Sequence, residues 1–409
     1  MRLLYLLTQD LDSPSGLGRY LPLARELAAL GHQVSIAALH PSFHTLSAKR
    51  LDLDGVRVSY VAPMHVIKEG SHKRYYSTPT LLRLALLAAL RLGQAANAAG
   101  AEIIHIGKPH PMNSLAALFA RRMSQRQTKP RLFLDCDDDE AASNRVSGAW
   151  QRRILDWFET RMPQQVERVT TNTLATRARL LQRGLPAERI FYLPNGVDRK
   201  RFSGVDPEQV ESLRSQLNLG KARIVAFIGS LSLTTHPVDL LLQAFCQVRT
   251  FAPDAILLLV GGGEDYTGLQ AMAGQMGLAD SVRFVGRVPP QDVPAYYRLA
   301  KASVDPVRDD AAARARSPLK LFESWASGVP FVSADVGDRR RLVGDPPAGL
   351  LAAPGDPESL AEALLSVLFN NPLAEALTQR GLSRVQSYYW DQLARRMQAE
   401  YQRQEPERA

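Results

Sequence analysis

The sequence contains little cysteine and no long apolar segment, and both deficits narrow the classes of protein that it can encode. Its two cysteines, Cys136 and Cys246, lie far apart and form no Cys-x-x-Cys pattern. We therefore expect neither a disulfide framework nor a zinc site. The longest apolar runs, such as residues 84–90, are far shorter than the roughly 20 residues that cross a bilayer. The sequence thus predicts a globular protein without a transmembrane helix.

The first residues also lack the pattern of a signal peptide. Residues 3–7 are apolar, but polar Thr8 and Asp10 follow at once, without a long apolar region or a small-residue cleavage site. We therefore expect a cytoplasmic protein.

Positive charge is concentrated in one half of the chain. The net charge is +9. Residues 1–200 carry 28 Lys or Arg against 17 Asp or Glu, whereas the remainder carries 22 against 24. A basic half attracts anionic membranes, phosphorylated acceptors or nucleic acid. The sequence contains no recognisable nucleic-acid-binding module, so we expect no nucleic-acid partner.

The length of 409 residues favours two or three domains, and the apolar pattern repeats twice. In the first half, strands expected at 3–7, 34–38, 57–61 and 103–106 alternate with amphipathic helices, including one over 81–99. Strands alternating with helices predict a parallel, doubly wound sheet. The same alternation begins again after the Asn195-Gly196 turn signal, with strands expected at 224–228, 255–260, 282–285, 302–305 and 330–333. The sequence therefore predicts two Rossmann-like α/β domains.

The most specific stretch is Ser-Pro-Leu-Lys-Leu-Phe-Glu-Ser-Trp-Ala-Ser-Gly-Val-Pro at 317–330. Pro318 suits the first turn of a helix and Gly328 its end. This stretch resembles the signature helix of family 4 retaining glycosyltransferases with the GT-B fold. Several other motifs follow in that family's order, among them the glycine loop 15–19, residues 194–198, 229–245, 260–263 and 284–286, and a last helix beginning near Trp390.

The resemblance implies the GT-B fold, in which two Rossmann-like, doubly wound domains face each other across a cleft and the C-terminal helix crosses back to the first. We accordingly expect an acceptor-binding domain at 1–197, a nucleotide-sugar donor-binding domain at 198–385, and a terminal helix within 386–409 that packs on the first domain.

The resemblance also implies site residues. Glu323 is expected to bind the ribose hydroxyls of the donor. The remaining expected donor-binding positions are Gly16, Gly18, Gly229, Ser230, His236, Gly262, Arg287, Val288, Ser317 and Leu319. The expected catalytic positions are Asp137, His105, Arg316 and Lys320.

Three departures from the family pattern bear on mechanism. The first of the family's two signature glutamates would fall at Ala315. The Arg and Lys that usually grip the donor diphosphate are replaced by Ser230 and by the residues around His236. The family's His after the middle strand of the first domain is replaced by an acidic run at 135–139.

Because negative charge builds on the departing diphosphate, another cation must replace the missing pair. Arg314, Arg316 and Lys320 flank the start of the signature helix. The alternatives to a role at the diphosphate are that the two arginines lie in a solvated loop and that Lys320 lies on an exposed helix face.

The acidic run leaves further alternatives open. An Asp135-x-Asp137 pair suits a divalent metal, whereas a contact from Asp137 or Asp138 to an acceptor hydroxyl fits the resemblance better. We therefore expect no metal site and no cofactor. His105 and His110 can equally be core or rim histidines. Basic residues near the helix at 81–90, namely Arg83, Arg91, Lys73 and Arg74, allow either a membrane-facing or a buried helix.

The sequence thus predicts a retaining glycosyltransferase that moves a sugar from a UDP- or GDP-linked donor to a glycan or lipid-linked acceptor, in polysaccharide or glycolipid synthesis. Peripheral association with the inner face of an anionic membrane is part of this prediction. A catalytically silent GT-B subunit that binds a glycan or a partner transferase is the alternative.

Overall fold

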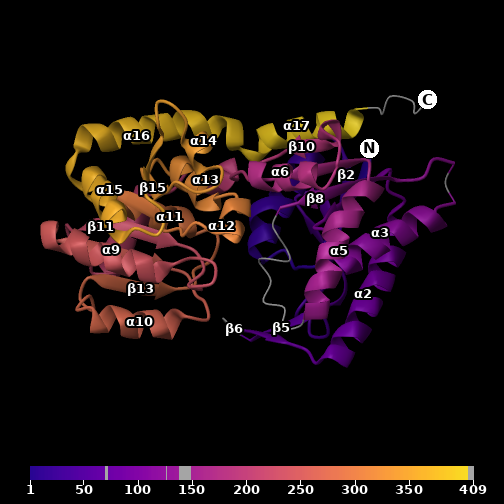
Figure 1. The fold of residues 1–409 in the computed structure, drawn as a ribbon, viewed down its shortest axis with the longest axis horizontal. Helices are drawn as coiled ribbons and strands as arrows, with labels where there is room; N and C mark the ends of the chain where they lie inside the picture. The colour runs from indigo at the N-terminus through magenta and orange to yellow at the C-terminus, as the bar shows by residue number, and fades with distance from the viewer. Residues whose placement is uncertain (70–71, 126, 138–148, 404–409) are drawn as a thin grey trace. The chain divides into compact units, whose positions relative to one another are not determined.

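The computed structural model describes the chain except residues 70–71, 126, 138–148 and 404–409 (Figure 1). The chain divides into two compact units. Unit 1 comprises Met1–Gly196, Ala315–Ser317 and the chain from Trp390 onward, and unit 2 comprises Val197–Arg314 and Pro318–Tyr389. The main division therefore falls after Gly196. The inclusion of Ala315–Ser317 in unit 1 is not indicated by any sequence pattern.

Unit 1 is built on an eight-stranded sheet in the order β10-β9-β8-β7-β1-β2-β4-β3, in which all neighbours are parallel except the edge pair β3 and β4. A two-stranded hairpin, β5 and β6, lies outside this sheet. The strands are β1 (Arg2–Leu6), β2 (Gln33–His40), β3 (Arg50–Leu53), β4 (Val56–Pro63), β5 (Val66–Glu69), β6 (His72–Tyr75), β7 (Ile103–Gly107), β8 (Arg131–Cys136), β9 (Arg168–Thr171) and β10 (Ile190–Tyr192).

The two faces of this sheet are covered by different helices because side chains alternate along each strand. In β1, Leu4 and Leu6 face one core, whereas Leu3 and Tyr5 face the other. Helices α2 (Thr78–Ala99), α3 (Pro111–Met123), α5 (Ala149–Gln165) and α6 (Leu174–Gln182) line the first core. Helices α1 (Leu21–Ala29) and α17 (Trp390–Gln402) line the second (Figure 1). The last helix therefore completes the core of unit 1, and its buried side includes Trp390, Met397 and Tyr401.

Unit 2 has a six-stranded, fully parallel sheet in the order β13-β12-β11-β14-β15-β16. Its strands are β11 (Arg223–Ile228), β12 (Ala255–Val260), β13 (Val282–Gly286), β14 (Ala302–Asp305), β15 (Phe331–Ala334) and β16 (Gly349–Ala352). The helices on one face are α9 (Val238–Phe251), α10 (Tyr266–Gln275), α15 (Pro357–Phe369) and α16 (Asn371–Arg384). The other face packs on α7 (Arg199–Phe202), α8 (Pro207–Gln216), α11 (Val293–Leu299), α13 (Leu319–Ala326), α14 (Arg339–Val343) and η3 (Val385–Tyr388).

The prediction of two doubly wound α/β domains is therefore confirmed. Among the described residues, no helix is both long enough and apolar enough to span a bilayer. Cys136 and Cys246 are free thiols, the first buried and the second partly buried.

Candidate functional site

The carboxyl ends of β11 and β12 in unit 2 meet backbone to backbone. A Cβ added to Gly261 would lie 1.9 Å from the carbonyl oxygen of Gly229, and one added to Gly263 would lie 2.1 Å from that of Leu231. Gly261 also has a φ of +143°, which side chains other than hydrogen rarely tolerate. Glycine is therefore required here by close packing, and it leaves backbone rather than side chains at this edge of the sheet. We call this edge, with Gly229, Gly261 and Gly263, the glycine edge.

A cluster of charged side chains lies beside this edge, at the end of β14. Asp305 ends that strand, and its carboxylate lies 3.1 Å from Lys320 Nζ and 2.9 Å from an Arg339 nitrogen. Both nitrogens of the His236 ring lie 3.3 Å from Lys320 Nζ, and Nδ1 lies 3.6 Å from Asp305. We call Asp305, Lys320, Arg339 and His236 the β14 cluster.

The β14 cluster carries an excess of positive charge. Burial would raise the pKa of Asp305, but the Lys320 ammonium and the Arg339 guanidinium outweigh it and hold that pKa well below its usual range. The Asp305 carboxylate thus faces two cations, Lys320 and Arg339, and also the His236 ring. Such a cluster is suited to bind an anion.

Lys320 reaches the glycine edge itself. A Cβ at Gly229 would lie 2.7 Å from Lys320 Cε, and the ammonium lies 5.0 Å from the centre of the Phe227 ring. The side chain is 12% exposed, so the alternative that Lys320 lies on an exposed helix face is wrong.

Glu323 lies one turn further along α13 and is held by two groups. Arg201 Nη1 donates to Oε1 at 3.3 Å, and the buried hydroxyl of Tyr297 donates to Oε2 at 3.1 Å. Arg201 also donates from Nε to the Pro290 carbonyl at 2.9 Å. Arg201 therefore connects the carboxylate of Glu323 to the loop that follows β13. Sequence reasoning missed Arg201 and Tyr297, because their partner lies 122 and 26 residues away.

The other expected cations are placed differently. Arg314 is exposed and donates two hydrogen bonds to Asp309, at 2.6 and 2.7 Å. Arg314 is therefore solvated, as the alternative expected, but it lies in the short helix α12 (Ala311–Ala315) and not in a loop. Arg316 is partly buried and belongs to the Ala315–Ser317 segment of unit 1. In that segment Ser317 is buried, and its hydroxyl accepts from the backbone N–H of Asn195 at 3.2 Å. Lys320 therefore lies in the β14 cluster, and Arg314 does not.

The remaining expected donor positions of unit 2 lie along the same edge. Ser230 is exposed directly after Gly229. Gly262 faces Arg287, since an added Cβ would lie 2.9 Å from that side chain, which is exposed. Val288 and Leu319 are partly buried.

The glycine turn of unit 1 is a helical turn, Gly16–Tyr20 (η1), directly before α1. A Cβ at Gly16 would lie 2.5 Å from the Asp10 carbonyl oxygen, and the Gly16 N–H already donates to Ser13 Oγ at 3.1 Å. Gly18 lies within the same turn. Close packing against residues 10–11 therefore explains Gly16.

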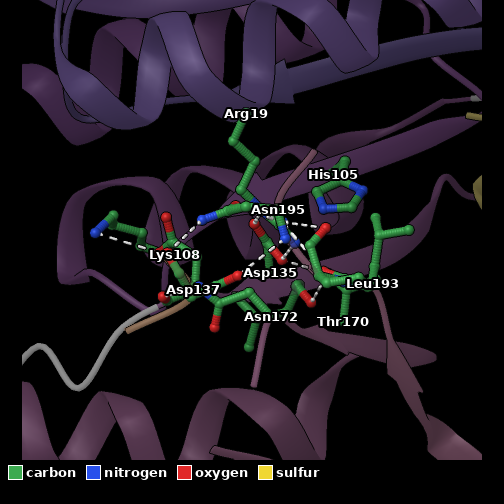
Figure 2. A network of polar contacts seen from close by, with 12 residues as sticks. Arg19, His105, Lys108, Asp135, Asp137, Thr170, Asn172, Leu193 and Asn195 are labelled. Carbon is green, nitrogen blue, oxygen red and sulfur yellow. Dashed lines mark hydrogen bonds and ion pairs between the residues drawn. The ribbon is translucent and has the colours of Figure 1, made fainter. Parts of the chain in front are cut away.

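Arg19, next to these glycines, is the centre of a buried network (Figure 2). Its Nε and Nη2 donate to the two oxygens of Asp135 at 2.6 and 2.7 Å, and both side chains are 2% exposed. Nη1 donates to the Leu193 carbonyl and to Asn195 Oδ1, each at 3.1 Å. Burial would raise the pKa of Asp135, but Arg19 outweighs it and lowers that pKa. Both Asp135 oxygens thus accept hydrogen bonds from Arg19 within the protein.

Asp137 is also paired. Its carboxylate lies 3.2 Å from Lys108 Nζ, and the side chain is 5% exposed (Figure 2). Asp138 and Asp139 lie outside the described residues. Within the described part of the chain, no three His, Cys, Asp or Glu side chains are grouped as metal ligands would be.

The structure places His105 in the core rather than at the rim. Its Nδ1 lies 2.6 Å from the hydroxyl of Tyr401 in α17, and its ring stacks on Tyr5. Burial lowers the pKa of His105 to about 4. A 2% exposed, neutral imidazole does not fit the expected catalytic role, and its place under α17 indicates that it stabilises the fold.

Comparison with known families adds two matches that together span most of the chain. Residues 15–196 match the family described as "Glycosyl transferase 4-like domain". Residues 222–370 match the family described as "Glycosyl transferases group 1".

Several bacterial enzymes are similar in sequence. The chain is 30% identical over 232 residues to the GDP-mannose-dependent alpha-(1-6)-phosphatidylinositol monomannoside mannosyltransferase of Mycobacterium tuberculosis, covering 56% of this chain and 60% of that one. It is 29% identical to the D-inositol 3-phosphate glycosyltransferase of Geodermatophilus obscurus, over 54% of this chain and 50% of the relative. Each relative is thus matched over less than two thirds of its own length.

Two solved structures share the fold. Sucrose-phosphate synthase from Thermosynechococcus elongatus superposes with a TM-score of 0.77 and 20% identity, over 98% of both chains. Anabaena Alr3699/HepE, solved in complex with UDP-glucose, superposes with a TM-score of 0.73 and 18% identity, over 98% of this chain and 99% of that one.

Proposed function

Because this chain belongs to the GT4-type glycosyltransferases and has their GT-B fold, we propose that it transfers a sugar from a nucleoside-diphosphate donor to a glycan or lipid-linked acceptor, with retention of configuration. The observation that carries this proposal is the pairing of Lys320 and Glu323 on α13. One helix presents a cation beside the glycine edge and a carboxylate one turn later.

Unit 2 would bind the donor. Glu323 accepts hydrogen bonds from the two ribose hydroxyls, and the backbone at Gly229 and Gly262 lets the diphosphate approach closely. Arg201 and Tyr297 hold the carboxylate in place for this contact. The loop at Arg287 and Val288 follows β13 and would contact the donor.

Lys320 would replace the Arg and Lys that the chain lacks. Negative charge grows on the β-phosphate as the bond to the sugar breaks, and a fixed ammonium stabilises that charge without reorganisation. The N-terminus of α13 adds partial positive charge. Asp305, which is itself paired with Arg339, holds the ammonium in position. Because cations of the protein fulfil this role, we expect transfer to proceed without a divalent metal or other cofactor.

The reaction needs no carboxylate pair of the kind used by retaining hydrolases. The resemblance implies a front-face transfer, in which a leaving phosphate oxygen accepts the proton of the attacking acceptor hydroxyl. The roles of Arg316 and Asp137 are predictions. Arg316 would neutralise the leaving group, and Asp137 would orient the acceptor hydroxyl.

The relatives support a particular class of donor and acceptor. The mycobacterial relative uses GDP-mannose and acts on a phosphatidylinositol monomannoside, whereas the Anabaena structures hold UDP or UDP-glucose. The shared donor chemistry is a nucleoside diphosphate sugar, linked to GDP or UDP. We propose a lipid-linked acceptor in glycolipid or polysaccharide synthesis, reached by peripheral association with the inner face of an anionic membrane. No finding supports the silent-subunit alternative, and Lys320 would supply a cation in place of the missing Arg and Lys.

Calorimetric titration with GDP and UDP tests the donor site directly. We expect one of them to bind, and Glu323→Ala to weaken binding roughly tenfold or more, since a charge-assisted hydrogen bond contributes about 1.5–3 kcal/mol. Glu362→Ala, an exposed acid on α15 of the same unit, is the matched control. Incubation with GDP-mannose and UDP-glucose, using phosphatidylinositol and inositol phosphate as acceptor probes, then tests transfer. The proposal fails if neither diphosphate binds and no sugar is transferred.

A further inference from the structure

Helix α2 has an unusual distribution of apolar side chains. The positions that face the core carry mostly small residues, among them Ala88 and Ala96, which are buried. Its outward side carries large apolar residues that are 38–65% exposed: Leu82, Leu86, Leu87 and Leu90. Leu82, Leu86 and Leu90 are four residues apart and therefore form one stripe along the helix.

The neighbouring helix α3 repeats this arrangement, whereas α5 shares only the exposed apolar stripe and buries large side chains such as Leu155 and Met162. Core-facing positions of α3 are mostly alanines, such as Ala116 and Ala120, besides Met112. Its exposed stripe, again at intervals of four, is Leu115, Phe119 and Met123. The exposed stripe of α5 is Trp150, Ile154 and Trp157.

The three stripes form one surface. All three helices cover the same face of the unit 1 sheet, and Figure 1 shows them along one side of it. Helix α3 packs against both of the others. A Cβ at Gly93 in α2 would lie 3.0 Å from the Phe119 ring, which places the stripe of α3 against α2. We call this surface the three-helix face.

Its apolar content is far above that of an ordinary surface. Of the thirteen large apolar side chains exposed in the described part of the chain, ten lie on these three helices. Single exposed apolar residues are normal, but a contiguous patch marks a binding surface.

The charges on these helices define the partner. Their sequences contain seven arginines and two acidic residues. Arg83, Arg91, Arg122 and Arg153 are among the exposed arginines. Of the two acids, Asp156 is paired with Arg183 at 2.6 Å and Glu159 is buried. The side chains of Lys73 and Arg74, which the sequence also places in this basic region, lie outside the described part of the molecule. The partner is therefore anionic and also accepts hydrocarbon side chains.

We infer that the three-helix face docks on the surface of an anionic lipid bilayer. Leu and Trp side chains enter the headgroup and upper acyl region, while arginines at the margin bind lipid phosphates. Nucleic acid would match the arginines but offers no hydrocarbon for ten apolar side chains. This inference rests on the proposed function only in that a lipid-linked acceptor gives the docking its purpose.

Vesicle sedimentation of the full chain tests the surface. We expect binding to vesicles of phosphatidylcholine with phosphatidylglycerol, weaker binding to phosphatidylcholine alone, and loss as salt is raised, because exposed charges are screened over about 8 Å at physiological ionic strength. Leu86→Glu with Trp157→Glu should raise the lipid concentration for half-binding roughly tenfold or more. Phe251→Glu with Phe369→Glu, two exposed apolar residues of unit 2 (68% and 51% exposed), is the matched control.

Tryptophan fluorescence gives a second readout. The chain has four tryptophans, of which Trp325 and Trp390 are 1% exposed and Trp150 and Trp157 are 42% and 56% exposed. Anionic vesicles should shift the emission to shorter wavelength, and Trp157→Phe should reduce that shift. Thermal unfolding confirms that each variant is folded.

Three results would overturn the inference. The first is equal binding to neutral and anionic vesicles, or binding to neither. The second is an equal loss of binding in the control variant, and the third is a wild-type dimer in solution that dissociates in the variant Leu86→Glu with Trp157→Glu. Titration with GDP and UDP separates this inference from the proposed function. Vesicle binding without nucleotide binding would refute the donor site and leave the docking surface intact.

Discussion

Replacing Lys320 by Met tests the donor site most directly, because it removes the charge and keeps most of the side-chain volume. Lys320 Nζ lies 3.1 Å from Asp305 and beside Gly229, in a side chain that is 12% exposed. The change therefore has two separable consequences, one for stability and one for binding of the diphosphate.

The effect on stability should be moderate. Breaking a buried ion pair by removing one partner costs about 3–5 kcal/mol when the other charge is left alone. Asp305 keeps Arg339 at 2.9 Å, so we expect the lower part of this range or less. The pKa of Asp305 should rise toward its usual value, because Lys320 contributes most among the charges that lower it.

The effect on the donor should be larger and specific to phosphate. A charge-assisted hydrogen bond contributes about 1.5–3 kcal/mol, which corresponds to roughly 10- to 150-fold in affinity. Calorimetry should show this loss for the nucleoside diphosphate and a smaller loss for the monophosphate. Turnover should fall more than affinity, because charge on the leaving group is greatest in the transition state.

Two variants control this experiment. Lys320→Arg keeps the charge and should retain part of the activity. Arg314→Ala removes an exposed arginine that is bound by Asp309 and should leave both binding and turnover unchanged. If a folded Lys320→Met protein binds the diphosphate and turns over like the wild type, then Lys320 only neutralises Asp305 and the reasoning is refuted.

The remaining predictions concern three other positions. Arg201→Ala should weaken nucleotide binding by roughly three- to tenfold through misorientation of Glu323, and calorimetry with an unchanged unfolding temperature would distinguish this from misfolding. Gly261→Ala should destabilise unit 2 by about 2–4 kcal/mol in denaturant unfolding, since its Cβ would collide with the Gly229 carbonyl. The pKa of the buried His105 is lowered from 6.5 to about 4. As the pH drops from 6.5 to 4, the unfolded chain therefore binds the proton first, and the free energy of unfolding should fall by about 3 kcal/mol in total. His105→Gln should remove that component, and identical pH profiles for mutant and wild type would contradict it.

The local pattern of the sequence determined most elements of the fold. Strands such as β12 and helices such as α2 follow from apolar runs and periodicity, and their observed bounds differ from the predicted ones by a few residues at most. The resemblance of residues 317–330 placed Glu323 on a helix, where the structure has it. These features depend on neighbours along the chain, which a sequence displays directly.

The composition of the charged sites was decided by the tertiary structure. Lys320 meets Asp305 because β14 ends beside α13, Arg201 meets Glu323 across 122 residues, and His105 meets Tyr401 across 296. No periodicity encodes such pairings, since each depends on how separate elements pack. The three-helix face is another case, because leucine stripes are read as core until the neighbours of each helix are known. Burial and charge at a site are sums over distant side chains, and only the folded chain brings those side chains together.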